Sequence, residues 1–231
     1  MEEFLGQKAR AFGFGHGVQN ITEIALRLNA QGDAAMSLAL ADVERAAFER
    51  LVVEKRRIEW LAGRLAAKRA FARYMRASDP GRAVPDIVVL NGRHRAPFVL
   101  GHSDVTLSIS HSAEYAVAVV GPHSIGVDIE RVEPRPLALA SYFCCPEERL
   151  FLERQWQFQG ERDVILTRLW SRKEAVAKFL RLGGRVDFKL INTLDDYVCV
   201  ERFSDETIRL ISEEQSGYCI SLALRTESAA R

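Results

Sequence analysis

Two carboxylates stand two residues apart in a short apolar segment of this 231-residue chain. Asp128 and Glu130 alternate with the apolar residues of 125–129, a pattern that predicts a β-strand. Side chains two residues apart on a strand point to the same face, so these carboxylates are expected side by side. They repel each other unless a cation or a shared proton lies between them. Carboxylate oxygens suit a hard cation, and the pair predicts a magnesium site.

A second charged segment, 170–178, has the periodicity of a helix. Glu174 lies on one flank of its apolar arc, together with Lys178, and supplies a third carboxylate. Because these two residues are four apart, an ordinary surface salt bridge is the alternative interpretation. Lys173 falls inside the arc, where an ammonium is costly unless it extends to solvent or meets an anion.

Basic residues gather upstream of both segments. Residues 43–95 hold 13 Lys and Arg against 6 Asp and Glu, although the whole chain has a net charge of +1. Arg57, Arg64 and Lys68 share one stripe of a predicted helix, which is either a solvated basic face or a site for phosphate. An excess confined to one segment favours a small, multiply charged anion over nucleic acid.

The predicted elements belong to the α+β class. One helical pattern runs from about 37 to 77 with a break near 51–53, and Asp79 and Pro80 are expected to end it. A loop over 110–114 places His111 at the end of a strand, where a lone histidine is usually structural or simply exposed. Further helices are expected from about Pro146 and over 163–182. Strands are expected at 87–90, 105–109, 116–120, 188–191, 198–200, 208–211 and 218–224.

The best internal boundary is Gly121-Pro122. It gives an N-terminal subdomain over 36–121 and a C-terminal one over 122–231, each with helices and a mostly antiparallel sheet. Residues 1–35 contain glycines at 13, 15 and 17, but no apolar strand precedes them and the phosphate-loop pattern is incomplete. We expect an irregular extension there, with a short helix near 21–28.

Three features of the sequence bear on the compartment and on membrane insertion. The four cysteines show no CxxC spacing, which indicates neither a zinc site nor a disulfide framework and favours a reducing compartment. The N-terminus lacks the features of a signal peptide, and no stretch approaches 18 apolar residues. The sequence therefore predicts a cytoplasmic protein without a membrane segment.

These motifs resemble a known family. GVDIE at 126–130 followed by WSRKEAVAK at 170–178 is similar to the signature of the 4'-phosphopantetheinyl transferases. LSISHS at 107–112 and, less closely, RRIEWLAGR at 56–64 resemble the longer, Sfp-like members. The resemblance implies transfer of the 4'-phosphopantetheine arm of coenzyme A to a serine of an acyl or peptidyl carrier protein, with release of 3',5'-ADP. It also implies a monomer whose two similar halves, related by a pseudo-twofold, hold coenzyme A between them.

The resemblance also implies residue roles. Asp128, Glu130 and Glu174 correspond to magnesium ligands, and either Glu174 or a metal-bound water would take the serine proton. Lys178 would hold the pyrophosphate, and Asp128, Glu174 and Lys178 form the catalytic set. The other implied coenzyme A contacts are Arg56 or Arg57, Arg64, His111, Lys173, and Arg95 with Arg93 as its alternative.

Two other functions remain open at this point. A magnesium-dependent nucleotide hydrolase would use similar carboxylates, but the chain lacks a Walker-type glycine loop. A module that binds coenzyme A or a carrier protein without turnover would not need Asp128, Glu130, Glu174 and Lys178 together. Which carrier is modified depends on surface shape, which the sequence does not give.

Overall fold

The computed structural model describes residues 1–231 except 38, 77–80, 82–85, 155–158, 201–203 and 227–231. The chain forms two compact units, Met1–Pro122 and His123–Arg231.

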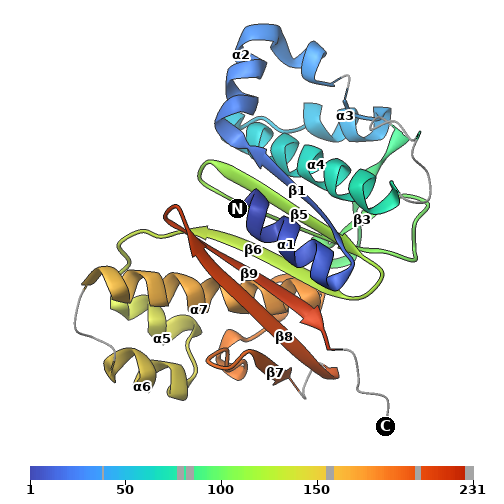
Figure 1. Ribbon diagram of the computed structural model, residues 1–231. Helices are drawn as coiled ribbons and strands as arrows, with labels where there is room; N and C mark the ends of the chain where they lie inside the picture. Colours follow the sequence, from blue (N-terminus) through green and yellow to red (C-terminus); the bar gives the residue numbers. More distant parts are fainter. Residues whose placement is uncertain (38, 77–80, 82–85, 155–158, 201–203, 227–231) are drawn as a thin grey trace. The chain divides into compact units, whose positions relative to one another are not determined.

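The first unit packs a long helix, α4 (Glu54–Met75), against an antiparallel sheet of order β1-β5-β4 (Figure 1). Its central strand, β5 (Tyr115–Gly121), is buried from residue 116 onward. Small residues of α4, such as Ala66 and Ala70, allow the helix to lie close to the sheet. The other described elements are α1 (Glu2–Phe12), β1 (Gly15–Asn20), α2 (Ile21–Ser37), α3 (Asp42–Glu49), β2 (Val89–Asn91), the 3-10 turn η2 (Arg93–Arg95), β3 (Pro97–Val99) and β4 (Thr106–Ser112).

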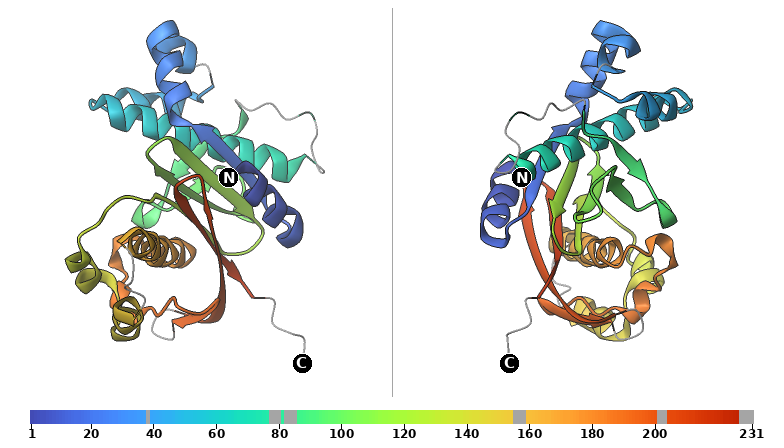
Figure 2. Two further views of the ribbon diagram at one scale, coloured as in Figure 1. Left: turned by 60° about the vertical axis from the view of Figure 1, so that its left-hand side comes forward. Right: turned by 90° about the vertical axis from the view of Figure 1, so that its right-hand side faces the viewer.

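The second unit repeats this plan. Its long helix, α7 (Gln159–Phe179), lies on one side of an antiparallel sheet of order β6-β9-β8-β7 (Figure 2). The predicted α+β class with mostly antiparallel sheets is therefore confirmed. The other described elements are β6 (Ile125–Arg131), η3 (Leu137–Leu139), α5 (Ala140–Phe143), α6 (Pro146–Arg154), η4 (Gly183–Arg185), η5 (Phe188–Leu190), β7 (Tyr197–Val200), β8 (Ser204–Gln215) and β9 (Tyr218–Arg225).

Glycine sets the distance between the long helix and the first strand in both units. A Cβ atom on Gly126 of β6 would lie 2.0 Å from the carbonyl oxygen of Ala175 in α7. A Cβ atom on Gly15 of β1 would lie 2.2 Å from the carbonyl oxygen of Ala70 in α4. No side chain fits at these distances, so each helix crosses its first strand in direct backbone contact. In both units the first strand pairs with the last, β1 with β5 and β6 with β9.

The expectation of an irregular extension over 1–35 was wrong. These residues form α1, β1 and most of α2, and β1 pairs in register with β5 from Gly15↔Val120 to Asn20↔Tyr115. Of the three glycines in the incomplete phosphate-loop pattern, Gly15 and Gly17 are packing positions that contact the backbone of α4, and Gly13 ends α1 with a φ of 67°. A short polar-looking strand was missed because its apolar partner is a helix surface distant in the sequence.

Two local expectations also changed. His111 lies within β4, opposite Ala116 of β5, because the connecting turn is only the two residues 113–114 and not the loop 110–114. The predicted strand at 188–191 is the 3-10 turn η5. The helix break near 51–53 is confirmed between α3 and α4, and the predicted turn at Asp79 and Pro80 lies outside the described residues.

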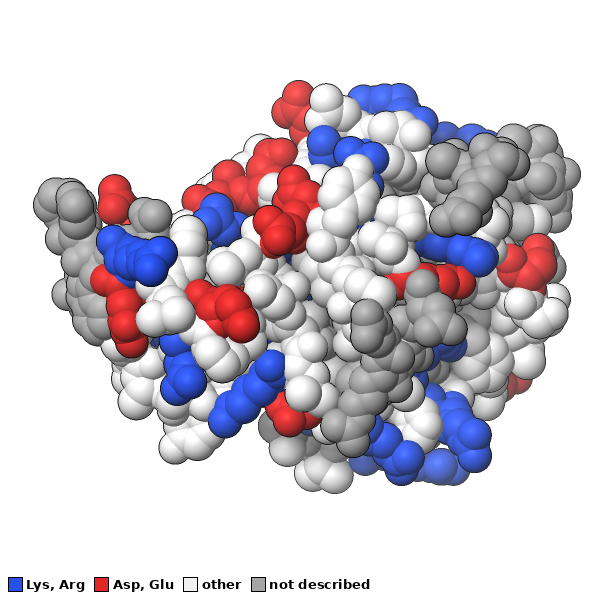
Figure 3. Space-filling view, turned by 90° about the horizontal axis from the view of Figure 1, so that it is seen from below, with Lys and Arg blue, Asp and Glu red and all other residues white. Residues whose placement is uncertain are grey.

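The surface charge is mixed. On the face shown in Figure 3, Lys and Arg side chains lie among Asp, Glu and uncharged residues. This face is not the uniformly basic surface that nucleic-acid binding favours. Within the described ranges, no helix has the length and apolar character needed to cross a membrane.

We predict that Gly126→Ala destabilises the protein by about 1–3 kcal/mol or more, because its methyl group overlaps the carbonyl of Ala175. Urea unfolding followed by circular dichroism measures the change. Gly160→Ala on α7 is the control, since a Cβ atom there meets nothing within 4 Å, and we expect its stability to be unchanged or slightly raised. Equal losses for the two variants would contradict the packing argument.

Candidate active site

Asp128 and Glu130 lie on the face of β6 that packs against α7. Gly126, two residues earlier on the same face, touches the helix backbone. The alternation of strand side chains then turns both carboxylates toward the helix. α7 faces them with polar side chains at four-residue spacing, which are Trp170, Glu174 and Lys178.

Asp128 is the most enclosed of these acids, with 2% of its surface exposed. Lys178 Nζ donates to Asp128 Oδ1 at 2.7 Å. The Lys178 side chain is 27% exposed, so its ammonium lies between a buried carboxylate and solvent. The short contact of Lys178 is therefore with the strand, and the surface pair with Glu174 is not its main role.

Glu130 is held by two donors. Trp170 Nε1 donates to Glu130 Oε1 at 3.0 Å, and Arg135 Nη2 donates to Glu130 Oε2 at 3.3 Å. Burial, followed by the charge of Asp128, nevertheless raises the pKa of Glu130. The hydrogen bond from Trp170 fixes the carboxylate without supplying a compensating full charge.

Glu174 shares this electrostatic environment. Burial raises its pKa, and the charges of Asp128 and Glu130 add to the rise, while Lys178 opposes it. The charges of both β6 carboxylates therefore act on Glu174 in the folded unit. Glu130 and Glu174 thus both have a raised pKa, a shift in the direction that favours proton transfer by a carboxyl group.

The donor chemistry fits a hard cation, since mutual repulsion of carboxylates is what such an ion relieves. Asp128 directs an oxygen to Lys178, however, and Glu130 directs its oxygens to Trp170 and Arg135. Among the described residues, no group of three or more His, Cys, Asp and Glu side chains is placed to hold a metal ion. The magnesium site at Asp128, Glu130 and Glu174 thus stays a prediction.

The assignment of Lys173 to coenzyme A was wrong. Its side chain is 0% exposed, and its ammonium pairs with Glu148 Oε2 at 2.7 Å. It also donates to the carbonyl oxygens of Phe188, at 2.8 Å, and Ile191. The apolar arc predicted that Lys173 either extends to solvent or meets an anion, and it meets an anion that is a side chain of the protein.

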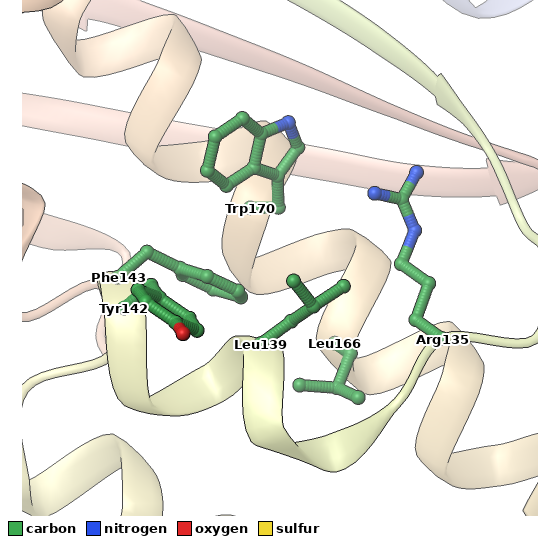
Figure 4. Close-up of a pocket in the computed structure, with 6 residues that line it drawn as sticks. All are labelled: Arg135, Leu139, Tyr142, Phe143, Leu166 and Trp170. Atoms are coloured by element: carbon green, nitrogen blue, oxygen red, sulfur yellow. The ribbon is translucent and has the colours of Figure 1, made fainter.

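An apolar pocket of about 250 Å³ adjoins Trp170 (Figure 4). The ring of Trp170 meets that of Phe143 edge-on, with centroids 5.2 Å apart, and Tyr142 is 75% exposed at this place. Arg135, which also binds Glu130, joins the pocket to the acids. Sequence reasoning missed Arg135, Tyr142 and Phe143 because a proline-flanked loop and a four-residue helix carry little periodic signal. The lining residues are Arg135, Leu139, Tyr142, Phe143, Leu166 and Trp170.

The first unit contains a second pocket of about 250 Å³, and this one is basic. Of the two pairs of alternatives left by the sequence, Arg56 and Arg95 line this pocket, and their contact with coenzyme A stays a prediction. Arg57 instead donates to the carbonyl oxygen of Leu51 at 3.0 Å. The lining residues come from α4, the β2–β3 hairpin and β4, and are Arg56, Glu59, Trp60, Gly63, Arg64, Asn91, Arg95, Pro97, Ile109 and His111.

Arg64 is a buried cation in this pocket, 6% exposed. Burial lowers its pKa to about 10, although the charge of Glu44 opposes the shift. Its Nη2 donates to Asn91 Oδ1 at 3.0 Å, and its guanidinium lies 4.6 Å from the centroid of the Trp60 ring. Its buried Nε has no hydrogen-bond partner in the described part of the chain. An anion in the pocket would supply one.

The turn that carries Arg95 is strained. His94 and Arg95 have φ angles of 55° and 62°, in the left-handed region that side chains other than glycine rarely adopt. Such strain, at a residue lining a pocket, is typical of functional sites. Asn91, at the end of β2, orients the guanidinium of Arg64 by accepting its hydrogen bond.

We predict that Glu174→Gln stabilises the metal-free protein by about 1 kcal/mol at pH 7–8, because it removes a desolvated charge that two other carboxylates repel. The raised pKa means that Glu174 costs stability as pH rises above its ordinary range, so the gain should shrink toward pH 4–5. Urea unfolding in EDTA at both pH values tests this. Lys178→Met should act in the opposite direction by about 1–3 kcal/mol, because it takes the cation from Asp128. A destabilising Glu174→Gln would refute the shared-repulsion model.

Comparisons with known proteins agree with the motifs. Residues 124–223 match the 4'-phosphopantetheinyl transferase superfamily, and residues 44–121 match the 4'-phosphopantetheinyl transferase N-terminal domain. A holo-[acyl-carrier-protein] synthase of Oceanobacillus iheyensis is 41% identical over 85 residues, which are 35% of this chain and 71% of that protein.

Two longer relatives are matched over smaller shares of their length. A 4'-phosphopantetheinyl transferase of Aneurinibacillus migulanus is 26% identical over 134 residues, 50% of this chain and 55% of that one. A 4'-phosphopantetheinyl transferase of Bacillus subtilis is 30% identical over 89 residues, 38% of each chain.

Among solved structures, a holo-(acyl-carrier-protein) synthase from Bacillus anthracis in complex with CoA (3',5'-ADP) is 32% identical, over 46% of this chain and 91% of that one, with a TM-score of 0.39. At that TM-score the structural match carries no further conclusion. The sequence matches are sufficient: this chain belongs to the 4'-phosphopantetheinyl transferase superfamily, in its Sfp-like class.

Proposed function

We propose that this protein transfers the 4'-phosphopantetheine arm of coenzyme A to a serine of an acyl or peptidyl carrier protein and releases 3',5'-ADP. The observation that carries the proposal is the acid cluster on β6 and α7, where Asp128, Glu130 and Glu174 share one electrostatic environment beside Lys178. A metal-dependent attack on a pyrophosphate needs this combination of charges.

The basic pocket of the first unit would hold phosphate groups of coenzyme A. Arg56, Arg64, Arg95 and His111 converge on one cavity, which gives several donors to a multiply charged anion. Arg64 supports this role most strongly, because its buried Nε–H has no hydrogen-bond acceptor among the described residues.

Asp128, Glu130 and Glu174 would hold a magnesium ion, which when bound neutralises charge on the pyrophosphate. Lys178 would bind a pyrophosphate oxygen, and its partly exposed ammonium is available from solvent. The serine Oγ forms a bond to the phosphorus next to pantetheine as the pyrophosphate P–O bond breaks. Glu174 would take the serine proton, and the bonding electrons leave with 3',5'-ADP. Magnesium dependence and action as a monomer are parts of this proposal.

We predict that the protein with coenzyme A and magnesium adds one phosphopantetheine to an apo carrier, observed as a mass gain on the intact carrier. Asp128→Asn should lose at least about 10²-fold in kcat, because a neutral amide does not hold the cation or Lys178 in the same way. Circular dichroism should show that the variant is folded. Nucleotide hydrolysis without carrier modification, or coenzyme A binding without turnover, would replace the proposal with one of its two rivals.

We also predict that neighbouring arginines contribute unequally to the binding of coenzyme A. Arg95→Ala and Arg56→Ala should each raise the KM for coenzyme A about tenfold, the effect of losing one charge-assisted hydrogen bond. Arg93→Ala and Arg57→Ala are the matched controls outside the pocket, and we expect changes below about threefold. Steady-state kinetics at fixed carrier concentration give the values. Equal effects within each pair would show that the pocket is not the anion site.

A further inference from the structure

One buried ion pair occurs twice in the chain, once in each unit. In the second unit, Lys173 of α7 pairs with Glu148 at 2.7 Å, and both side chains are 0% exposed. In the first, Lys68 of α4 pairs with Glu44 at 2.6 Å, and both are again 0% exposed. Each glutamate is the third residue of a short helix, α6 or α3, and each lysine lies on the long helix.

Each glutamate also binds backbone donors in an equivalent way. Glu148 Oε2 accepts from Cys145 N at 3.0 Å, before the start of α6, and Glu148 Oε1 accepts from Thr193 N at 2.9 Å and Thr193 Oγ1 at 2.8 Å. Glu44 Oε2 accepts from Ala41 N at 3.0 Å, before the start of α3, and Glu44 Oε1 accepts from Val89 N at 2.9 Å. Each pair thus joins a short helix, a long helix and a distant backbone segment.

A buried ion pair differs from an apolar contact because its hydrogen bonds are directional. Two buried charges gain little net stability over apolar residues of similar volume, because their desolvation offsets their attraction. Their hydrogen bonds do require particular distances and angles. An apolar helix face tolerates rotation or sliding more easily, since the hydrophobic effect is not directional.

Lys173 precedes Glu174 directly. Fixing the Lys173 ammonium on Glu148, Phe188 and Ile191 fixes the rotation of α7 about its axis at this residue. That rotation determines where Glu174 points, and Lys178 one turn later. In the first unit, Arg64 lies one turn before Lys68, and Asn91, which orients Arg64, belongs to the strand that donates Val89 N to Glu44.

We propose that the Glu148–Lys173 pair is a positioning device that sets the rotation of α7 and so aims Glu174 at the carboxylates of β6. The equivalent Glu44–Lys68 pair sets α4 and the basic pocket. Both residues of each pair are positioning residues and touch no substrate. This inference rests on the proposed function for its kinetic consequences only.

The test compares two matched double variants, Glu148→Gln/Lys173→Met and Glu44→Gln/Lys68→Met. Each removes both charges and keeps the side-chain shapes, so the losses of stability should be similar. For the first we expect kcat to fall about tenfold or more, with KM for coenzyme A within about threefold, because small displacements of catalytic groups reduce the rate strongly. For the second we expect the reverse, a raised KM and a kcat within about threefold.

A spectroscopic signal reports the position of α7 without any assay. Trp170 Nε1 donates to Glu130, so its indole N–H resonance, identified by Trp170→Phe, is sensitive to the contact between α7 and β6. It should shift in the Glu148/Lys173 variant and stay in place in the Glu44/Lys68 variant. If the wild-type protein transferred nothing, the proposed function would fail, yet this resonance would still test the positioning role.

Unchanged kcat and an unchanged indole resonance in a folded Glu148/Lys173 variant would overturn the inference. Equal loss of kcat in both double variants would also overturn it, because the pairs would then act only through general stability. If either double variant does not fold, Thr193→Val removes one hydrogen bond to Glu148 and leaves the ion pair. It should shift the indole resonance and lower kcat several-fold, and a wild-type result on both measures counts against the inference.

Discussion

The backbone contact between β6 and α7 is the constraint on which the candidate site depends. Gly126 lets the helix approach until no Cβ atom would fit, and at that separation side chains two and four residues along the strand reach those of the helix. Trp170 and Lys178 each meet a β6 carboxylate, and Glu174 lies in the electrostatic field of both. A bulkier residue at this position would separate the strand from the helix and reduce the burial that, together with repulsion between the carboxylates, raises the pKa values of Glu130 and Glu174.

The first unit uses the same contact with different chemistry. Gly15 contacts Ala70 and Tyr74 of α4 as Gly126 contacts Ala175 and Phe179 of α7, so positions in the two units correspond. By that correspondence Gly17 stands where the second unit has Asp128, Arg69 where it has Glu174, and Arg73 where it has Lys178. Arg69 and Arg73 donate to the carbonyl oxygens of Val18 and His16 on β1. The same architecture thus carries the acid cluster in the second unit and a basic pocket in the first, where the cations lie on α4 and the β2–β3 hairpin.

Buried charge is handled in two ways. Fully enclosed pairs, such as Glu148 with Lys173, are satisfied by their own partners and by backbone groups. Glu130, Glu174 and the guanidinium of Arg64 are only partly compensated, and burial shifts the pKa of each against its charged form. A ligand of opposite charge would stabilise groups of the second kind, and such groups are typical of binding sites, whereas the enclosed pairs are not.

The sequence by itself determined the acid-bearing strand, the helix of Trp170, the basic character of 43–95 and the α+β class, because strand alternation, helical periodicity and charge are local properties. It also predicted that Lys173 either extends to solvent or meets an anion. Only the tertiary structure decided that Lys173 meets the carboxylate of Glu148, that Arg56 and not Arg57 lines the basic pocket, and that residues 15–20 pair with β5. These outcomes depend on which surfaces meet across long sequence separations. A lysine inside an apolar arc has the same local signal whether its partner is a substrate phosphate or a carboxylate 25 residues earlier in the chain.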